Sequence, residues 1–266
     1  VIRKRFPILK ISREEWRLEA ARAKELLGTG VPMGLQFSIT AIGSVVVQWS
    51  VNSLGVSAVA AVAAAGKLSM FFCCVFDALA TTMATFSGQN IGACKPHRIQ
   101  EGLKDCSIIG TVYCLAAYGV ILFFGQHLLS LFVDGTSEPQ VMDMALRFIR
   151  LNGLFYIPLL FVNILRLTIQ GMGFTRVAMF AGVFEMVART LVALLLVPVL
   201  GFTGACLANP AAWIMADLFL IPCYRHSIRS VRQRLNAAVL DTPQGARILP
   251  FRRESRPKEH RMSTSA

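Results

Sequence analysis

The sequence carries no charged residue between Glu25 and Lys67, a run of 41 positions. At about 1.5 Å of rise per residue, a single helix of that length would extend about 60 Å. The hydrocarbon core of a bilayer is only about 30 Å thick. The run is therefore too long for one crossing, and the turn-forming stretch NSLGVS, residues 52–57, divides it into two. This pattern predicts a chain that crosses a membrane more than once.

Four more apolar runs follow, and the composition agrees with them. Charged residues make up 16% of the chain and hydrophobic residues 55%, whereas a soluble domain carries about 25% charge. We therefore predict an all-α, polytopic membrane protein. Its six expected transmembrane helices span residues 31–51, 58–86, 106–133, 146–169, 177–200 and 202–224.

The connecting segments alternate between basic and base-free. Eight Lys or Arg residues precede the first run, and bases recur after the second, fourth and sixth runs, whereas the other three connections carry none. The positive-inside rule then places both termini and the KPHR loop, residues 95–98, in the cytoplasm. We expect a multi-pass protein of the plasma (inner) membrane with membrane lipid as a partner. The net charge of +12 is not gathered on one face, so we expect no nucleic-acid partner.

Ionisable residues inside the runs require a partner or a function, because burying charge in a membrane is costly. Lys67 and Asp77 lie ten positions apart, about 15 Å along a helix, and cannot pair directly. Glu185 and Arg189 have the i, i+4 spacing of an ion pair. Asp217 lies near the membrane surface or pairs with Lys67. Structural pairing and a substrate or ion pathway both remain open for these residues.

Uncharged polar residues and prolines complete the expected pathway. We expect a polar chamber lined by Gln36, Gln48, Asn152, Tyr156 and Asn163, and bends at Pro32, Pro158 and Pro210. Arg166 is expected to snorkel to the cytoplasmic surface. Neither a His cluster nor a GxSxG motif is present, so we expect no enzyme, no metal site and no cofactor.

The second run ends in GQNIGACKPHR, residues 88–98. Gly88 and Gly92 are expected to end the helix or to allow close approach, and Gln89 and Asn90 to bond the carbonyls freed at the helix end. This stretch resembles a motif in the second helix of the C-terminal lobe of the multidrug and toxic compound extrusion (MATE) family. Further resemblances occur in the expected order: VPMGLQFSITAIGS, FYIPLLFVNILRLTIQGMGFTR, VFEMVART and GFTGACLANPAAWIMAD.

The resemblance implies one six-helix lobe of a twelve-helix secondary antiporter. Such a transporter exports drugs or toxic organic compounds, organic cations among them, in exchange for Na⁺ or H⁺ as the coupling ion. We expect a piece of a longer protein in which the N-terminal six-helix lobe is missing. Its expected parts are a basic linker over residues 1–26, the lobe over 27–227, and a basic disordered cytoplasmic tail over 228–266.

The sequence departs from one branch of the family. NorM-like members carry acidic residues in the first and fourth helices of this lobe, but here the first has only Gln36 and the fourth has no acid after Asp143. A NorM-type cation site is therefore in doubt. Two other interpretations remain: a lipid-linked oligosaccharide flippase of the same superfamily, and a non-transporting membrane fragment. The charges of Lys67, Asp77, Glu185, Arg189 and Asp217 sum to −1, which disfavours a flippase that holds pyrophosphate.

Overall fold

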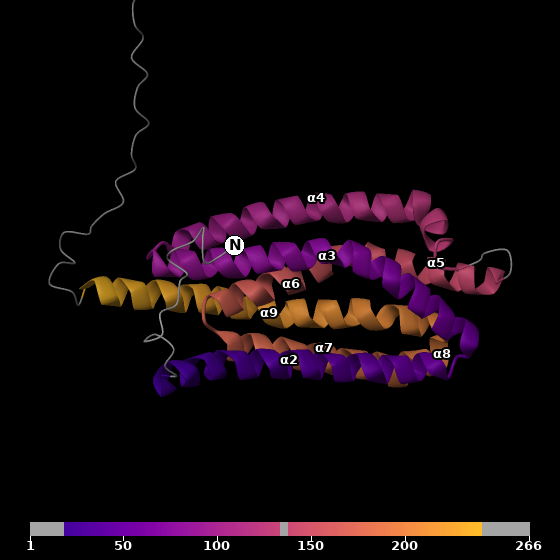
Figure 1. The fold of residues 1–266 in the computed structure, drawn as a ribbon, viewed down its shortest axis with the longest axis horizontal. Helices are drawn as coiled ribbons and strands as arrows, with labels where there is room; N and C mark the ends of the chain where they lie inside the picture. The colour runs from indigo at the N-terminus through magenta and orange to yellow at the C-terminus, as the bar shows by residue number, and fades with distance from the viewer. Residues whose placement is uncertain (1–18, 134–137, 241–266) are drawn as a thin grey trace, which may run out of the picture.

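The computed structural model describes residues 19–133 and 138–240, and the chain there is a bundle of helices. Most of the helices run along the long axis of an elongated bundle (Figure 1). Helices α2 (Ala20–Asn52), α3 (Val56–Gly92) and α4 (Pro96–Leu129) are followed by α5 (Pro139–Leu154) and α6 (Tyr156–Gly171). The chain then forms α7 (Thr175–Leu191), a π-helical turn at Val192–Leu196, the short α8 (Val197–Leu200) and the long α9 (Phe202–Leu240).

Within the described ranges, five helical segments are long and apolar enough to cross a membrane: α2, α3, α4, α7 with its extension to Leu200, and α9 to Leu235. Helices α5 and α6 pass the same test only as a pair, and the pair is bent by 54°. Counting that pair as one crossing gives the six spans that the sequence predicts. The all-α polytopic fold is confirmed.

The fourth predicted crossing is broken rather than continuous. Helix α5 ends at Leu154, Phe155 adopts a non-helical conformation, and α6 begins at Tyr156. Pro158 therefore stands in the first turn of α6, where its missing N–H leaves no helical bond unmade. The expected bend at this proline is present, whereas Pro32 and Pro210 lie inside helices that continue through them.

The helices at both ends of the lobe extend beyond its expected bounds of residues 27–227. Helix α2 already begins at Ala20, inside the expected linker, and α9 continues to Leu240. The prediction of disorder from residue 228 is wrong for residues 228–240, because Ile228 and Val231 are buried there and anchor the helix. Residues 1–18 and 241–266, and with them most of the expected linker and tail, lie outside the described residues.

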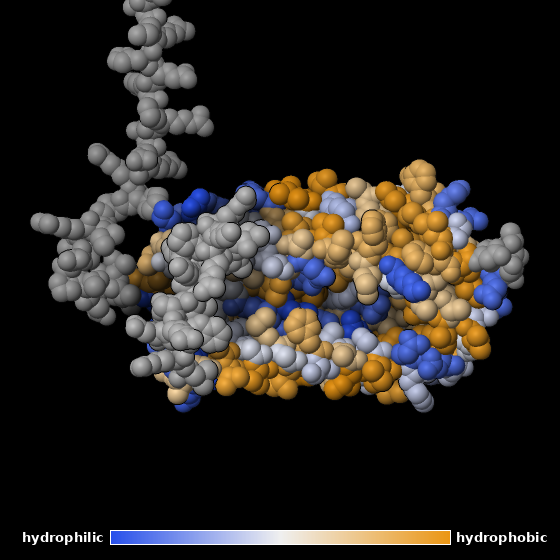
Figure 2. All heavy atoms as spheres, viewed as in Figure 1, coloured by the Kyte–Doolittle hydropathy of each residue, from blue (hydrophilic) through white to orange (hydrophobic). Residues whose placement is uncertain are grey.

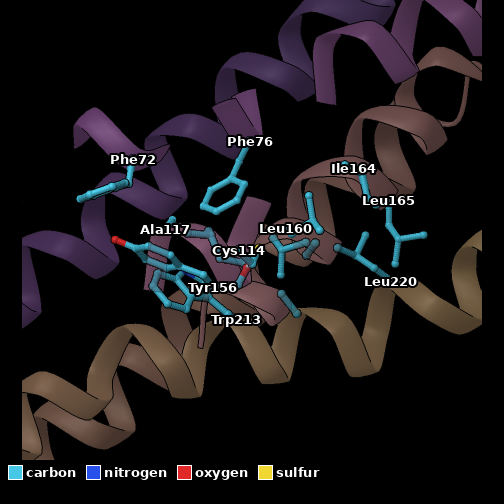
Figure 3. Packing of buried hydrophobic residues seen from close by; sticks show 14 of the residues in the cluster. Phe72, Phe76, Cys114, Ala117, Tyr156, Leu160, Ile164, Leu165, Trp213 and Leu220 are labelled. Carbon is cyan, nitrogen blue, oxygen red and sulfur yellow. The ribbon is translucent and has the colours of Figure 1, made fainter. Parts of the chain in front are cut away.

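The core is built where α3, α4, α6 and α9 meet. Phe76 of α3 packs edge-on against Tyr156 of α6, with ring centroids 5.5 Å apart, and against Tyr113 of α4 at 5.6 Å. Figure 3 shows Tyr156 between Phe76 and Trp213 of α9. These aromatic contacts fix the start of α6 against α3 and α9, and so hold the break in place.

Close helix approaches depend on glycines at two contacts. A Cβ atom on Gly171 would stand 2.9 Å from the Cα of Ala84, so α6 touches the backbone of α3 there. A Cβ atom on Gly43 would stand 3.0 Å from the Cα of Met186, which brings α2 onto α7. Helix α2 packs mainly on α7, whereas α3 packs on α4, α5 and α6. The first two helices therefore diverge after their shared turn.

The surface agrees with burial in lipid. Large apolar side chains such as Phe37, Phe71 and Phe123 are exposed on α2, α3 and α4. Figure 2 shows apolar surface over α4 and along α2, with a band of hydrophilic residues between α2 and α3. That band follows the gap in which Figure 1 shows α6, α9 and α7. The polar interior of the lobe therefore lies between the two diverging helices.

Candidate functional site

Four charged side chains are gathered inside the lobe, and we call them the ionic cluster: Arg166, Glu185, Arg189 and Asp217. The Arg166 guanidinium of α6 forms an ion pair with the Glu185 carboxylate of α7. Arg189 lies on the other side of Glu185, with Nη2 3.7 Å from Oε2. The side chains of Arg166, Glu185 and Arg189 are 11%, 3% and 8% exposed. Charges this deeply buried are stable only as a balanced set.

Asp217 of α9 completes that balance. It lies close enough to Arg166 to attract it electrostatically, and it is half-buried. Its Oδ1 atom is buried and has no hydrogen-bond partner among the described residues. The four side chains together carry no net charge. Each of the other three residues also has at least one buried polar atom without a hydrogen-bond partner among the described residues.

Polar stripes at helical spacing place these groups together. Helix α6 contributes Asn163, Arg166 and Gln170, and α7 contributes Glu185 and Arg189. Residues three, four and seven positions apart share one face of a helix. Helix α2 adds Gln36 to this polar stripe, because Gln170 Nε2 of α6 donates a hydrogen bond to Gln36 Oε1 at 2.6 Å.

Arg189 also bonds α2 directly. Its Nη1 atom donates to the carbonyl oxygen of Thr40 at 3.2 Å and lies 3.4 Å from the Ser44 hydroxyl oxygen. The guanidinium therefore joins Glu185 of its own helix to the backbone of α2. Such a bridge is possible because Gly43 of α2 lets the two helices approach closely.

A small chamber lies next to the ionic cluster. Its volume is about 300 Å³, at the lower end of the range for ligand pockets. Its polar lining residues come from five helices: Ser69, Asn152, Tyr156, Arg189 and Asn209. Asn209 Nδ2 donates to Asn152 Oδ1 at 3.3 Å, so these two amides form one polar wall. Arg189 is the charged residue that belongs to both the chamber and the ionic cluster.

A second polar surface follows α3. A groove of about 610 Å³ is lined by Asp77, Thr81, Thr82, Thr85 and Gln89, with Ala78 and Phe86. The three threonine hydroxyls donate to carbonyl oxygens four residues earlier, at 2.7, 2.8 and 3.1 Å. Their remaining lone pairs, together with the Asp77 carboxylate, make this exposed surface rich in acceptors.

The predicted site residues thus fall into separate groups. The Glu185–Arg189 pair is present. Lys67 does not approach Asp217: it lies in another groove, with Glu138 and Val133 at the opposite end of α3 from Gln89. The Lys67–Asp217 pair, one of the two alternatives for Asp217, is therefore not formed, and the charged side chain that acts electrostatically on Asp217 is Arg166 of α6. The expectation that Arg166 snorkels is also wrong, since Glu185 and Asp217 hold its guanidinium inside the lobe.

The expected chamber is only partly assembled. Asn152 and Tyr156 line it, whereas Gln36 lies in the stripe beside Gln170 and Gln48 is exposed on α2. Asn163 donates to Leu159 of its own helix at 3.0 Å. Gln170 and Asn209 are the residues that sequence reasoning missed. The spacing to a charged residue on the same helix could have indicated them. Gln170 lies four positions after Arg166, and Asn209 lies eight positions before Asp217.

The GQNIGA segment follows the expectation at Gly88, which allows a close approach, but not at Asn90. Asn90 Nδ2 donates to the Phe86 carbonyl oxygen, 2.8 Å away and inside the helix. The freed carbonyls at the helix end instead accept backbone N–H groups of Cys94 and Lys95, with Cys94 left-handed at φ 56°. Gly88 faces the backbone of Gly171, so it serves the contact with α6, and no atom crowds Gly92.

Comparison with known proteins identifies the family. The model of the MatE family matches residues 32–195. The chain belongs to the MatE family. Solved MATE structures share its fold: one in the bent conformation aligns with TM-score 0.76 and 16% identity, over 85% of this chain and 50% of that one. A MATE structure in complex with MaL6 aligns with TM-score 0.77 and 17% identity, over 84% and 51%.

Two curated relatives share shorter segments with this MATE chain. The FAD transporter of Shewanella oneidensis is 30% identical over 112 residues, which are 42% of this chain and 24% of that protein. The probable multidrug resistance protein YpnP of Bacillus subtilis is 27% identical over 138 residues, 52% of this chain and 30% of that protein. The chain spans about half the length of the solved MATE structures it matches.

Proposed function

We propose that this chain is one six-helix lobe of a secondary antiporter that exports drugs or toxic organic compounds in exchange for Na⁺ or H⁺. The observation that supports this most is the buried ionic cluster beside a polar chamber, in a lobe whose outer surface is apolar. Buried charge inside a membrane protein is costly and commonly marks a substrate or ion pathway. A purely structural lobe would not need four such groups.

The geometry suggests how ion and substrate sites are coupled. Arg166 is attracted by both Glu185 and Asp217. When Asp217 takes up a proton or a Na⁺ ion, its attraction for Arg166 weakens, and Arg166 is held by Glu185 alone. Glu185 then holds Arg189 less strongly, and Arg189 lines the chamber. Loading of Asp217 would therefore change the charge that the chamber presents to a substrate.

A second lobe is part of this proposal. The solved MATE chains are about twice as long as the aligned segment, and transporters of this kind bind substrates at the interface between repeats. We therefore expect an N-terminal six-helix lobe to complete the pathway, with both termini of this chain in the cytoplasm. Transport by two copies of this chain is the competing arrangement. The ionic cluster is neutral once Arg166 is included, so it gives no support to a pyrophosphate-binding flippase.

The decisive experiment is ethidium accumulation in an efflux-deficient bacterial host. We expect the chain alone to insert without lowering accumulation, and co-expression with a MATE N-terminal half to lower it. Asp217→Asn should abolish that effect, whereas Asp143→Asn, at an exposed position on α5, should leave it unchanged. Ion-dependent efflux by the chain alone would contradict the half-transporter proposal and support a dimer of identical lobes.

An anionic substrate is a second candidate. Arg189 is the one charged side chain among the lining residues of the chamber, and the relative from Shewanella oneidensis is an FAD transporter. A chamber of about 300 Å³ is too small for a whole dinucleotide, so it would receive one part of such a molecule. Export of FAD by the two-lobe assembly would favour this alternative if Arg189→Gln abolished it. Ethidium efflux should be retained in the same variant.

A further inference from the structure

A groove on the outer surface of the lobe lies between α4 and α9, away from the chamber. Its volume is about 580 Å³. The α4 side consists of residues on one helical face, and Tyr224 is contributed by α9. The lining residues are Gln100, Leu103, Lys104, Ser107, Ile108, Thr111, Val112 and Tyr224. None of these residues belongs to the ionic cluster or to the chamber.

The groove is polar at one end and apolar at the other. Lys104 and Gln100 lie near the start of α4, and Ile108 and Val112 lie one to two turns further along. Arg232 of α9 reaches the polar end, where its Nη2 atom donates to Gln100 Oε1 at 2.8 Å. A ligand that fits this groove therefore has a polar group at one end and a hydrocarbon portion at the other.

Two groups at the polar end can still donate hydrogen bonds: the Lys104 ammonium and the Gln100 amide. The hydroxyls of Ser107 and Thr111 already donate to helix carbonyls, each at 2.7 Å. Gln100 has used its oxygen for Arg232, which leaves its amide NH₂ group to donate. The Tyr224 hydroxyl is buried and has no hydrogen-bond partner among the described residues. Because that hydroxyl is buried, it is closed to a ligand in the groove, and an acceptor there would meet Lys104 and the Gln100 amide.

The charges around the groove favour an anion. Lys104 is exposed and forms no ion pair within the part of the chain that the structure describes. Two carboxylates, Glu101 and Asp105, also lie on α4, but neither lines the groove. The facing end of α9 is basic, with Arg225, Arg229, Arg232 and Arg234. Basic pockets between transmembrane helices on the cytoplasmic side are a known arrangement for anionic lipid head groups.

We propose that the groove between α4 and α9 binds an anionic phospholipid of the leaflet that faces the basic end of the lobe. Lys104 and the Gln100 amide contact the phosphate, and an acyl chain lies along Ile108 and Val112. The apolar half of the groove selects a lipid over a soluble phosphate ester. This proposal does not depend on transport, because the groove lies outside the chamber.

Native mass spectrometry of the purified full chain in detergent tests it, with phosphatidylglycerol and phosphatidylcholine of identical acyl chains. We expect phosphatidylglycerol to bind about fivefold more tightly, the ratio that one basic side chain near an anionic surface provides. Lys104→Gln should remove the preference. Lys67→Gln is the matched control, because Lys67 is also exposed on a helix but lies in a different groove.

Three results would overturn the proposal. Equal binding of the two lipids would show that the groove does not recognise charge. An equal loss of preference in Lys104→Gln and Lys67→Gln would show that only overall charge matters. Displacement of phosphatidylglycerol by free glycerol phosphate at equal concentration would show that the apolar half contributes nothing. Lys104 is exposed, so its substitution tests binding without endangering the fold.

Discussion

The Arg166 guanidinium of α6 is paired with the Glu185 carboxylate of α7, and this contact joins two helices on either side of the turn at residues 172–174. Two arginines share the Glu185 carboxylate, because Arg189 Nη2 lies 3.7 Å from Glu185 Oε2 on the side away from Arg166. One carboxylate thus separates two buried guanidiniums. The stability of this part of the lobe should therefore depend on Glu185 more than on either arginine alone.

Glu185→Gln should consequently be the most harmful single change in the ionic cluster. It leaves Arg166 and Arg189 facing each other without a negative charge between them, at a cost of about 3–5 kcal/mol. Arg189→Ala should destabilise the protein less than Glu185→Gln, because Glu185 still forms its ion pair with Arg166. The double variant Glu185→Gln, Arg189→Met should be milder than either single change, because Arg166 is then balanced by Asp217.

Thermal unfolding of the detergent-purified protein measures these effects. Glu19→Gln is the control, since Glu19 and Arg22 form an ion pair at 2.7 Å whose side chains are 58% and 79% exposed. Exposed pairs contribute about 0–1 kcal/mol, so this variant should melt like the parent. If Glu185→Gln also melts like the parent, water reaches the cluster and the burial argument fails.

The hydrogen bond between Gln36 and Gln170 should stabilise the contact of α2 with α6. Both side chains are buried, and the donor–acceptor distance is 2.6 Å. Gln36→Leu or Gln170→Leu alone leaves a buried amide unpaired, which costs about 1–3 kcal/mol, whereas replacing both partners is close to neutral. A double-mutant cycle on melting temperature would show this coupling, and additive single effects would contradict it.

The sequence predicts interactions between residues that are close along the chain better than interactions between residues on different helices. Charge-free runs and base-rich loops predicted the spans, because the bilayer constrains length and composition locally. The i, i+4 spacing predicted the Glu185–Arg189 pair, because both residues lie on the same helix. Arg166 was misplaced because its partners, Glu185 and Asp217, lie on other helices, and only the packing of α6 against α7 and α9 brings them together.

The break at Phe155 illustrates an intermediate case. Pro158 indicated a bend, but the 54° break between α5 and α6 also depends on Tyr156, which packs against Phe76 of α3. Likewise, no local signal reveals that Asn209 meets Asn152 to form a wall of the chamber. Contacts between helices distant in sequence decide the site, whereas local patterns decide the spans.

Gly171→Ala should destabilise the contact between α6 and α3. The added Cβ atom would stand 2.9 Å from the Cα of Ala84, and backbone cannot move aside as a flexible side chain can. Overpacking of this kind costs about 1–3 kcal/mol. Gly119→Ala in α4 is the matched control: its Cβ would meet nothing within 4 Å, and alanine favours a helix by up to about 1 kcal/mol. The melting temperature should fall in the first variant only.

The orientation of the lobe in the membrane is the last prediction. Lys95 lies in the loop between α3 and α4, and Arg98 lies in the first turn of α4. Helix α9 ends at the same end of the bundle with four arginines, whereas the turn between α2 and α3 has no base. Arg232 contacts Gln100, so these two basic segments are adjacent in space. Because basic residues are retained in the cytoplasm during insertion, this end should face inward and the turn at Ser53 outward.

Single-cysteine labelling of intact cells with a membrane-impermeant maleimide measures that orientation. The seven native cysteines are first replaced, and cysteine is then placed at Ser53 or at Arg98, both exposed positions. We expect Ser53→Cys to react in intact cells and Arg98→Cys to react only after the membrane is made permeable. Labelling of Arg98→Cys in intact cells would mean that the lobe is inverted. The groove beside Lys104 would then face the outer leaflet.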